Sequence, residues 1–137
     1  MKFDLNDPFF VMARVEGLNG KVRELRAILD INSHFSLIFP VHAKTLGYEE
    51  AMAPISSYGK VFPNRVALYL GLLAIERGIL INLKKVSIGK LEAENVETVI
   101  PEIPPSMWLP FDLILGRSFL KNFRLTFDGR NKYLILK

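Results

Sequence analysis

Turn-forming residues divide this 137-residue chain into segments that are mostly too short for long helices. Glycine, proline, asparagine and serine mark turns at residues 17–20, 47, 56–59, 63–64, 78, 89, 101–105, 110 and 128–129. The segments between these marks have the length of strands, and several of them alternate or run apolar as strands do. The sequence therefore predicts an all-β domain.

Two hairpins are expected from the turn signals. Residues 9–15 and 22–29 flank an Asn-Gly pair at 19–20, which tight primed turns favour because both central residues need a positive φ. Residues 123–127 and 133–136 flank an Asp-Gly pair in the same way. Both pairs of segments are predicted to form antiparallel strands.

The remaining segments are assigned from their local patterns. Residues 86–89 and 95–100 are typical of strands. Residues 40–47 are expected to form a short helix because proline stands near the start and glycine at the end, and residues 117–123 because their apolar residues share one helical face. By period alone, residues 66–75 could be a buried helix or a strand, and we assign them as a strand.

The composition is that of an ordinary folded domain with a basic surface. Half of the residues are apolar, and the formal net charge is +4. The basic residues are scattered and not interleaved with aromatic residues, so we expect no nucleic-acid binding. The absence of cysteine excludes disulfides and cysteine-ligated zinc. His34 and His42 have no third ligand in view, so no metal site is expected.

Two features bear on the location of the protein. The first ten residues become acidic and polar too early for a secretory signal peptide. The most apolar window, residues 66–83, is interrupted by Glu76 and Arg77, which disfavours a membrane span. We therefore expect a cytoplasmic protein that does not bind membranes.

One carboxylate stands at the end of an apolar strand. Asp30 follows Ala27-Ile28-Leu29 and precedes Ile31, Asn32 and Ser33. A charge at the end of a core strand costs free energy unless a nearby group uses it. Two interpretations remain open from the residues alone: an Asx turn with Ser33, or a carboxylate that does chemistry.

Two segments, taken together, favour the second interpretation. The first, AILDINSHFSLIFPVHAKTLGY at 27–48, reads as strand, aspartate, turn, second strand and a helix that ends in Leu-Gly. The second, FDLILGRSFLKNFRLTFDGRNKYLILK at 111–137, reads as an apolar-apolar-Gly unit, a short helix and a closing hairpin. In this order they resemble a retropepsin-like aspartic protease domain, the single-lobe relative of pepsin.

The resemblance implies a fold and a division of the chain. The expected fold is an all-β, pepsin-like or retropepsin-like closed β-barrel lobe with one or two short helices. This domain is expected to cover residues 9–137, after an N-terminal extension at residues 1–8. Gly71 and Gly78 are both candidates for the tip of the flap that covers the site in this family.

The resemblance also implies a site. Asp30 is the expected catalytic residue, and Ile31, Asn32 and Ser33 complete its loop. Leu115, Gly116 and Arg117 are the expected structural support of this loop. In the family the loop is threaded through the strand–Gly–helix unit, so Leu115 and Gly116 should pack beside Asp30, with glycine needed because a side chain would strike the loop.

The implied chemistry is peptide-bond hydrolysis by a water held between two carboxylates, without a cofactor. One chain supplies one such loop, so activity implies a homodimer in which each chain contributes Asp30. The expected substrate is a peptide or an unfolded protein.

The active-site loop differs from the family pattern Asp-Thr/Ser-Gly. Ile31 lacks the hydroxyl that joins the two loops of a dimer, and Asn32 stands where the family has glycine. His34 stands where viral members carry the acid that pairs with the arginine after the second glycine, so this partner is not available to Arg117. Two functions therefore stay open: an aspartic endopeptidase, or a catalytically inactive dimerisation or peptide-binding module with the same fold.

Overall fold

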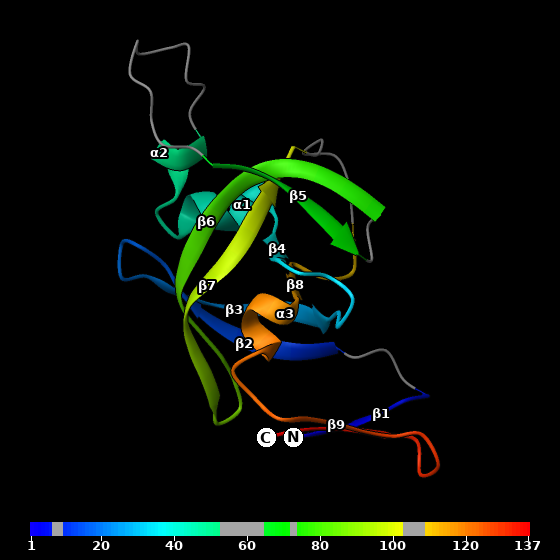
Figure 1. Ribbon diagram of the computed structural model, residues 1–137. Coiled ribbons are helices and arrows are strands. Elements are labelled where there is room, and N and C mark those ends of the chain that lie inside the picture. The colour runs from blue at the N-terminus through cyan, green and yellow to red at the C-terminus, as the bar shows by residue number, and fades with distance from the viewer. Residues whose placement is uncertain (7–9, 53–64, 72–73, 103–108) are drawn as a thin grey trace.

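Strands form most of the structure, a computed structural model that describes residues 1–6, 10–52, 65–71, 74–102 and 109–137 (Figure 1). The strands are β1 (Lys2–Asp4), β2 (Phe10–Glu16), β3 (Val22–Leu29), β4 (Ser36–Ile38), β5 (Arg65–Gly71), β6 (Ala74–Ile88), β7 (Leu91–Pro101), β8 (Leu113–Leu115), β9 (Leu125–Asp128) and β10 (Tyr133–Leu136). The helices are α1 (Pro40–Thr45), α2 (Glu49–Met52) and α3 (Arg117–Leu120). The all-β prediction is confirmed.

Six strands close into a barrel. The larger sheet has the order β2-β3-β8-β4-β7-β6-β5, and β2 pairs a second time with β6, from Arg14↔Ser87 to Glu16↔Lys85. This second pairing closes the ring and leaves β5 outside it as a partner of β6. Closure pairs strand edges that would otherwise be open to other chains.

A small sheet of order β1-β10-β9 lies beside both chain ends (Figure 1). β1 pairs with β10 in an antiparallel register from Lys2↔Ile135 to Asp4↔Tyr133. The amino group of Met1 also donates to the Leu136 carbonyl at 2.7 Å. The predicted boundary at residue 8 lies outside the described residues, which resume at Phe10.

The alternation of apolar residues along the strands places the core inside the barrel. In β3, Leu25, Ala27 and Leu29 are buried while the residues between them are more exposed, as a strand with one face on the core requires. Both α1 and α3 add buried side chains to the same cluster, which includes Ala43 and Phe119. A second, smaller apolar cluster contains Leu37, Phe39, Tyr69, Val99, Phe111 and Ile114.

The predicted strands and helices are present, with differences at their ends. The segment assigned as a strand at 66–75 covers most of β5 and the start of β6, and the turn expected at Gly78 is wrong because β6 continues through it. α1 begins at the predicted proline, whereas α3 is shorter than the predicted 117–123. α2 was not predicted, so the described residues hold three short helices rather than one or two. None of these helices is long and apolar enough to cross a membrane.

The prediction of a tight primed turn at Asn19-Gly20 is wrong. β2 and β3 stop pairing at Glu16↔Val22, which leaves a longer connection, and of the central pair Gly20 has a positive φ (78°) but Asn19 does not. The turn is closed one step earlier: the Gly20 N–H donates to Gly17 O at 3.2 Å, and the Gly17 N–H donates to Lys21 O at 3.0 Å. The same loop packs against the end of α1, where a Cβ on Gly17 would collide with the carbonyl oxygen of Leu46. The Asn19 side chain reinforces this packing by donating to Thr45 O at 3.1 Å.

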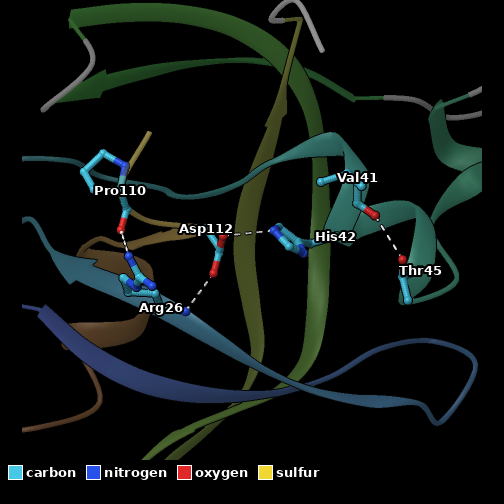
Figure 2. A network of polar contacts seen from close by, with 6 residues as sticks. All are labelled: Arg26, Val41, His42, Thr45, Pro110 and Asp112. Carbon is cyan, nitrogen blue, oxygen red and sulfur yellow. Dashed lines mark hydrogen bonds and ion pairs between the residues drawn. The ribbon is translucent and has the colours of Figure 1, made fainter. Parts of the chain in front are cut away.

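A polar network joins α1 to the strands below it (Figure 2). His42 Nε2 on α1 lies 3.1 Å from Asp112 Oδ1, and Asp112 Oδ2 accepts a hydrogen bond from the backbone N–H of Arg26 at 3.0 Å. The Asp112 N–H donates to Arg26 O at 2.7 Å, and the Arg26 guanidinium donates to Pro110 O at 2.9 Å. This network fixes the start of the parallel pair β3–β8.

We expect Asp112→Ala to lower the free energy of unfolding by about 1–2 kcal/mol, because it removes the acceptor for the Arg26 N–H and the ring of His42. Asp112→Asn keeps an acceptor of the same shape and should cost less. Thr45→Ala removes only the exposed bond from the Thr45 hydroxyl to Val41 O within α1 and serves as a control. Urea unfolding measures all three, and equal stability of the two Asp112 variants would contradict the proposed role of the network.

Candidate active site

Asp30 stands directly after β3, at the point where the chain leaves the barrel. β3 and β8 run parallel with Leu29 opposite Leu115, and the Asp30 N–H donates to Leu115 O at 3.0 Å. The carboxylate is fixed from its own loop, because the Asn32 N–H donates to Asp30 Oδ1 at 3.0 Å. Asp30 therefore does form an Asx turn, but its partner is the N–H of Asn32 rather than Ser33.

The loop at residues 30–33 crosses the segment between β8 and α3. Arg117 N–H donates to Ser33 O at 2.8 Å, and Ser118 N–H donates to His34 O at 2.9 Å. A Cβ on Gly116 would collide with the carbonyl oxygen of Phe35 and lie 2.6 Å from Ser33 Oγ. The two segments are therefore in backbone contact, and the crossing has no room for a side chain at position 116.

Two buried serines fasten this crossing. Ser36 Oγ accepts the Gly116 N–H at 3.0 Å and lies 2.8 Å from Ser118 Oγ, which in turn accepts the Ser36 N–H at 3.0 Å. Neither serine was predicted to belong to the site. The available signal was a serine inside the apolar run at 35–38, since a buried hydroxyl needs a hydrogen-bond partner.

The hairpin of β5 and β6 also reaches the carboxylate. Tyr69 Oη donates to Asp30 Oδ2 at 3.1 Å. Gly71 pairs with Ala74 at the end of the described hairpin, whereas Gly78 lies inside β6, where it pairs with Ala67 and Pro101. A Cβ on Gly71 would lie 2.5 Å from Asp30 Oδ2, whereas one on Gly78 would meet Ile100, so Gly71 is the candidate beside the site.

Exposure differs among the predicted site residues. Asp30 is half-buried, Ser33, Leu115 and Gly116 are buried, and Ile31, Asn32 and Arg117 are exposed. Ile31 keeps 46 % of its surface exposed, although it is a large apolar residue next to a carboxylate. The structure thus brings the two predicted segments together through backbone atoms, and Arg117 takes part through its N–H.

The described residues contain no group of three histidine, aspartate or glutamate side chains that could hold a metal ion. Asp30 Oδ1 accepts a hydrogen bond from a backbone N–H, and Oδ2 accepts one from a phenol. This donor set can orient a carboxylate, and a carboxylate held in this way can take part in acid–base chemistry on a water molecule.

Comparison with known proteins gives similarity in structure only. No family model matches the sequence, and neither does any curated protein. The crystal structure of a retropepsin-like aspartic protease from Rickettsia conorii matches with a TM-score of 0.58 and 19 % identity, over 99 % of this chain and 88 % of that chain. The retroviral protease-like domain of Ddi1 from Leishmania major matches with a TM-score of 0.46 and 14 % identity, over 95 % of this chain and 88 % of that one.

We expect Gly116→Ala to destabilise the protein by about 3 kcal/mol or to prevent folding, because the added methyl group would meet the backbone of the 30–35 segment, which cannot move without breaking the crossing. Gly129→Ala is the matched control, since its Cβ would approach only the ring of the exposed Phe127. Thermal or urea unfolding of both variants is the measurement. A Gly116→Ala protein as stable as Gly129→Ala would show that the crossing is looser than described.

Proposed function

We propose that this chain, which has the retropepsin-like fold that its two segments predicted, is an aspartic endopeptidase. The observation that carries the proposal is the position of Asp30 directly after β3, beside Leu115 and Gly116. The loop is held there by backbone hydrogen bonds and by the Gly116 contact, so the carboxylate has a fixed place in the fold. Fixed placement of an acid–base group is what catalysis by a side chain requires.

The proposed enzyme is a homodimer. Hydrolysis of a peptide by this chemistry needs two carboxylates, one that activates the water and a protonated one that polarises the substrate carbonyl. The chain has one aspartate loop of this kind, and a two-fold axis beside the loop would supply the second Asp30. The exposed apolar side chain of Ile31, next to Asp30, supports a contact between copies at this place.

The replacement of the family glycine by Asn32 is compatible with this proposal. Among the described residues other than glycine, positive φ occurs at Asn95 and Lys132, so the backbone at Asn32 does not need glycine. Its N–H donates to Asp30 Oδ1, a bond that any residue except proline could make. The Asn32 side chain is exposed and leaves this bond in place.

The loss of the loop hydroxyl at Ile31 is also compatible with it. Three other serine hydroxyls act close to the crossing: Ser33 Oγ donates to Asp30 O at 3.2 Å, and Ser36 and Ser118 bond each other. These hydrogen bonds lie within one chain, so they hold its active-site loop without a contribution from a second copy. The proposed substrate is a peptide or an unfolded protein, and the cytoplasmic location stays a prediction.

We expect Asp30→Asn to reduce cleavage of an unfolded protein substrate by at least about 100-fold, because the carboxylate supplies the acid–base step. The substitution keeps an acceptor for the Asn32 N–H, so the fold and the dimer should persist. Cleavage is measured by gel assay from about pH 3 to 7, with sedimentation as the test of the dimer. Asp112→Asn also removes one carboxylate, away from the loop, and should retain activity.

Cleavage that survives Asp30→Asn would contradict the proposal, because another group would then do the chemistry. A wild-type protein that sediments as a dimer but cleaves nothing across this range would favour the inactive dimerisation or peptide-binding module. A monomer with no activity would count against both functions.

A further inference from the structure

The Asp30 carboxylate is hydrogen-bonded through both oxygens within one chain. Oδ1 accepts the Asn32 N–H at 3.0 Å, and Oδ2 accepts the Tyr69 hydroxyl at 3.1 Å. The first bond comes from the loop itself and orients the side chain. The second comes from β5, which belongs to a different part of the fold and approaches the carboxylate from the side of the hairpin.

Gly71 fills the remaining space on the same side of the carboxylate. A Cβ on Gly71 would lie 2.5 Å from Asp30 Oδ2, 2.7 Å from Tyr69 Oη and 2.8 Å from Ser33 Cβ. A gap that cannot hold one methyl group cannot hold a water molecule together with a peptide. In this conformation the approach to Oδ2 from the hairpin side is therefore occupied by the chain itself.

The Tyr69 side chain is well anchored in this position. It is fully buried, and its ring packs in the apolar cluster with Leu37, Phe39, Val99, Phe111 and Ile114. The packing of the ring therefore positions the hydroxyl beside Asp30. Removal of the hydroxyl alone should leave the packing intact.

The strand that carries Tyr69 can move without opening the barrel. β5 stands outside the closed ring, and its strand partner in the described structure is β6, with which it pairs from Arg65↔Leu80 to Gly71↔Ala74 (Figure 1). Displacement of β5 alone breaks its pairing with β6 and leaves every pairing of the closed ring unchanged.

We infer that Tyr69 is a self-blocking residue, whose hydroxyl, together with Gly71, occupies the place over Asp30 that substrate must take. The inference rests on the proposed function and adds a regulatory contact to it. A peptide then has to displace Tyr69 from Asp30 before it binds, so the fraction of closed molecules weakens the apparent affinity for substrate.

The test compares Tyr69→Phe with Tyr48→Phe by amide hydrogen exchange. Tyr48 is a matched control: it is also a buried tyrosine, and its hydroxyl donates to Asn82 O at 2.7 Å, away from Asp30. We expect Tyr69→Phe to speed exchange in β5 and the facing end of β6 by about 3- to 30-fold, as loss of one hydrogen bond to a charged group allows. Tyr48→Phe should leave exchange in β5 unchanged, because its hydroxyl bonds Asn82 of β6, beyond the residues that pair with β5.

Exchange in β5 that is the same in wild type and Tyr69→Phe overturns the inference, and so does an equal increase in Tyr48→Phe. This measurement needs no enzyme activity, so it separates failure of the inference from failure of the proposed function. In the cleavage assay, Tyr69→Phe should lower KM for a peptide by a similar factor with little change in kcat. A lower kcat with unchanged KM would assign Tyr69 to the chemistry and overturn the blocking role.

Discussion

The parallel pairing of β3 with β8 brings together two segments that are far apart in the chain, and the rest of the site depends on it. The pair is secured at both ends by different means. At its start, the carboxylate of Asp112 links Arg26 to His42 on α1. At its end, the backbone of Asp30 bonds Leu115, and Gly116 passes directly against the loop. Because this pairing is short, its alignment relies on these end contacts.

The crossing explains how the chain can differ from the family pattern and keep the fold. What the crossing requires is close backbone contact, which depends on the missing side chain of Gly116 and on the N–H groups of Arg117 and Ser118. The buried hydroxyls of Ser36 and Ser118 add to it. The side chains of Ile31 and Asn32 face no such requirement, since both are exposed. The sequence can therefore vary at 31 and 32 while it holds glycine at 116.

Local sequence signals predicted the strands and helices of the fold. The features that were not predicted depend on contacts between residues far apart in the chain. Turn residues act on their own neighbours, so the strands around 19–20 and 128–129 could be located. The first turn nevertheless begins at Gly17, which also lies against Leu46 of a distant segment. The meeting of Asp30 with Gly116 was expected only through the resemblance. The hydrogen bond from Tyr69 to Asp30 could not be predicted from the sequence. The direction in which one side chain of an apolar segment points depends on where the whole β5–β6 hairpin lies.

The small sheet beside the chain ends has a consequence for assembly. β10 lies between β1 and β9 and is hydrogen-bonded on both sides within its own chain. Two copies of this chain cannot exchange their C-terminal strands unless each first breaks one of these pairings. In the proposed homodimer, the two copies would therefore join as subunits that are already folded.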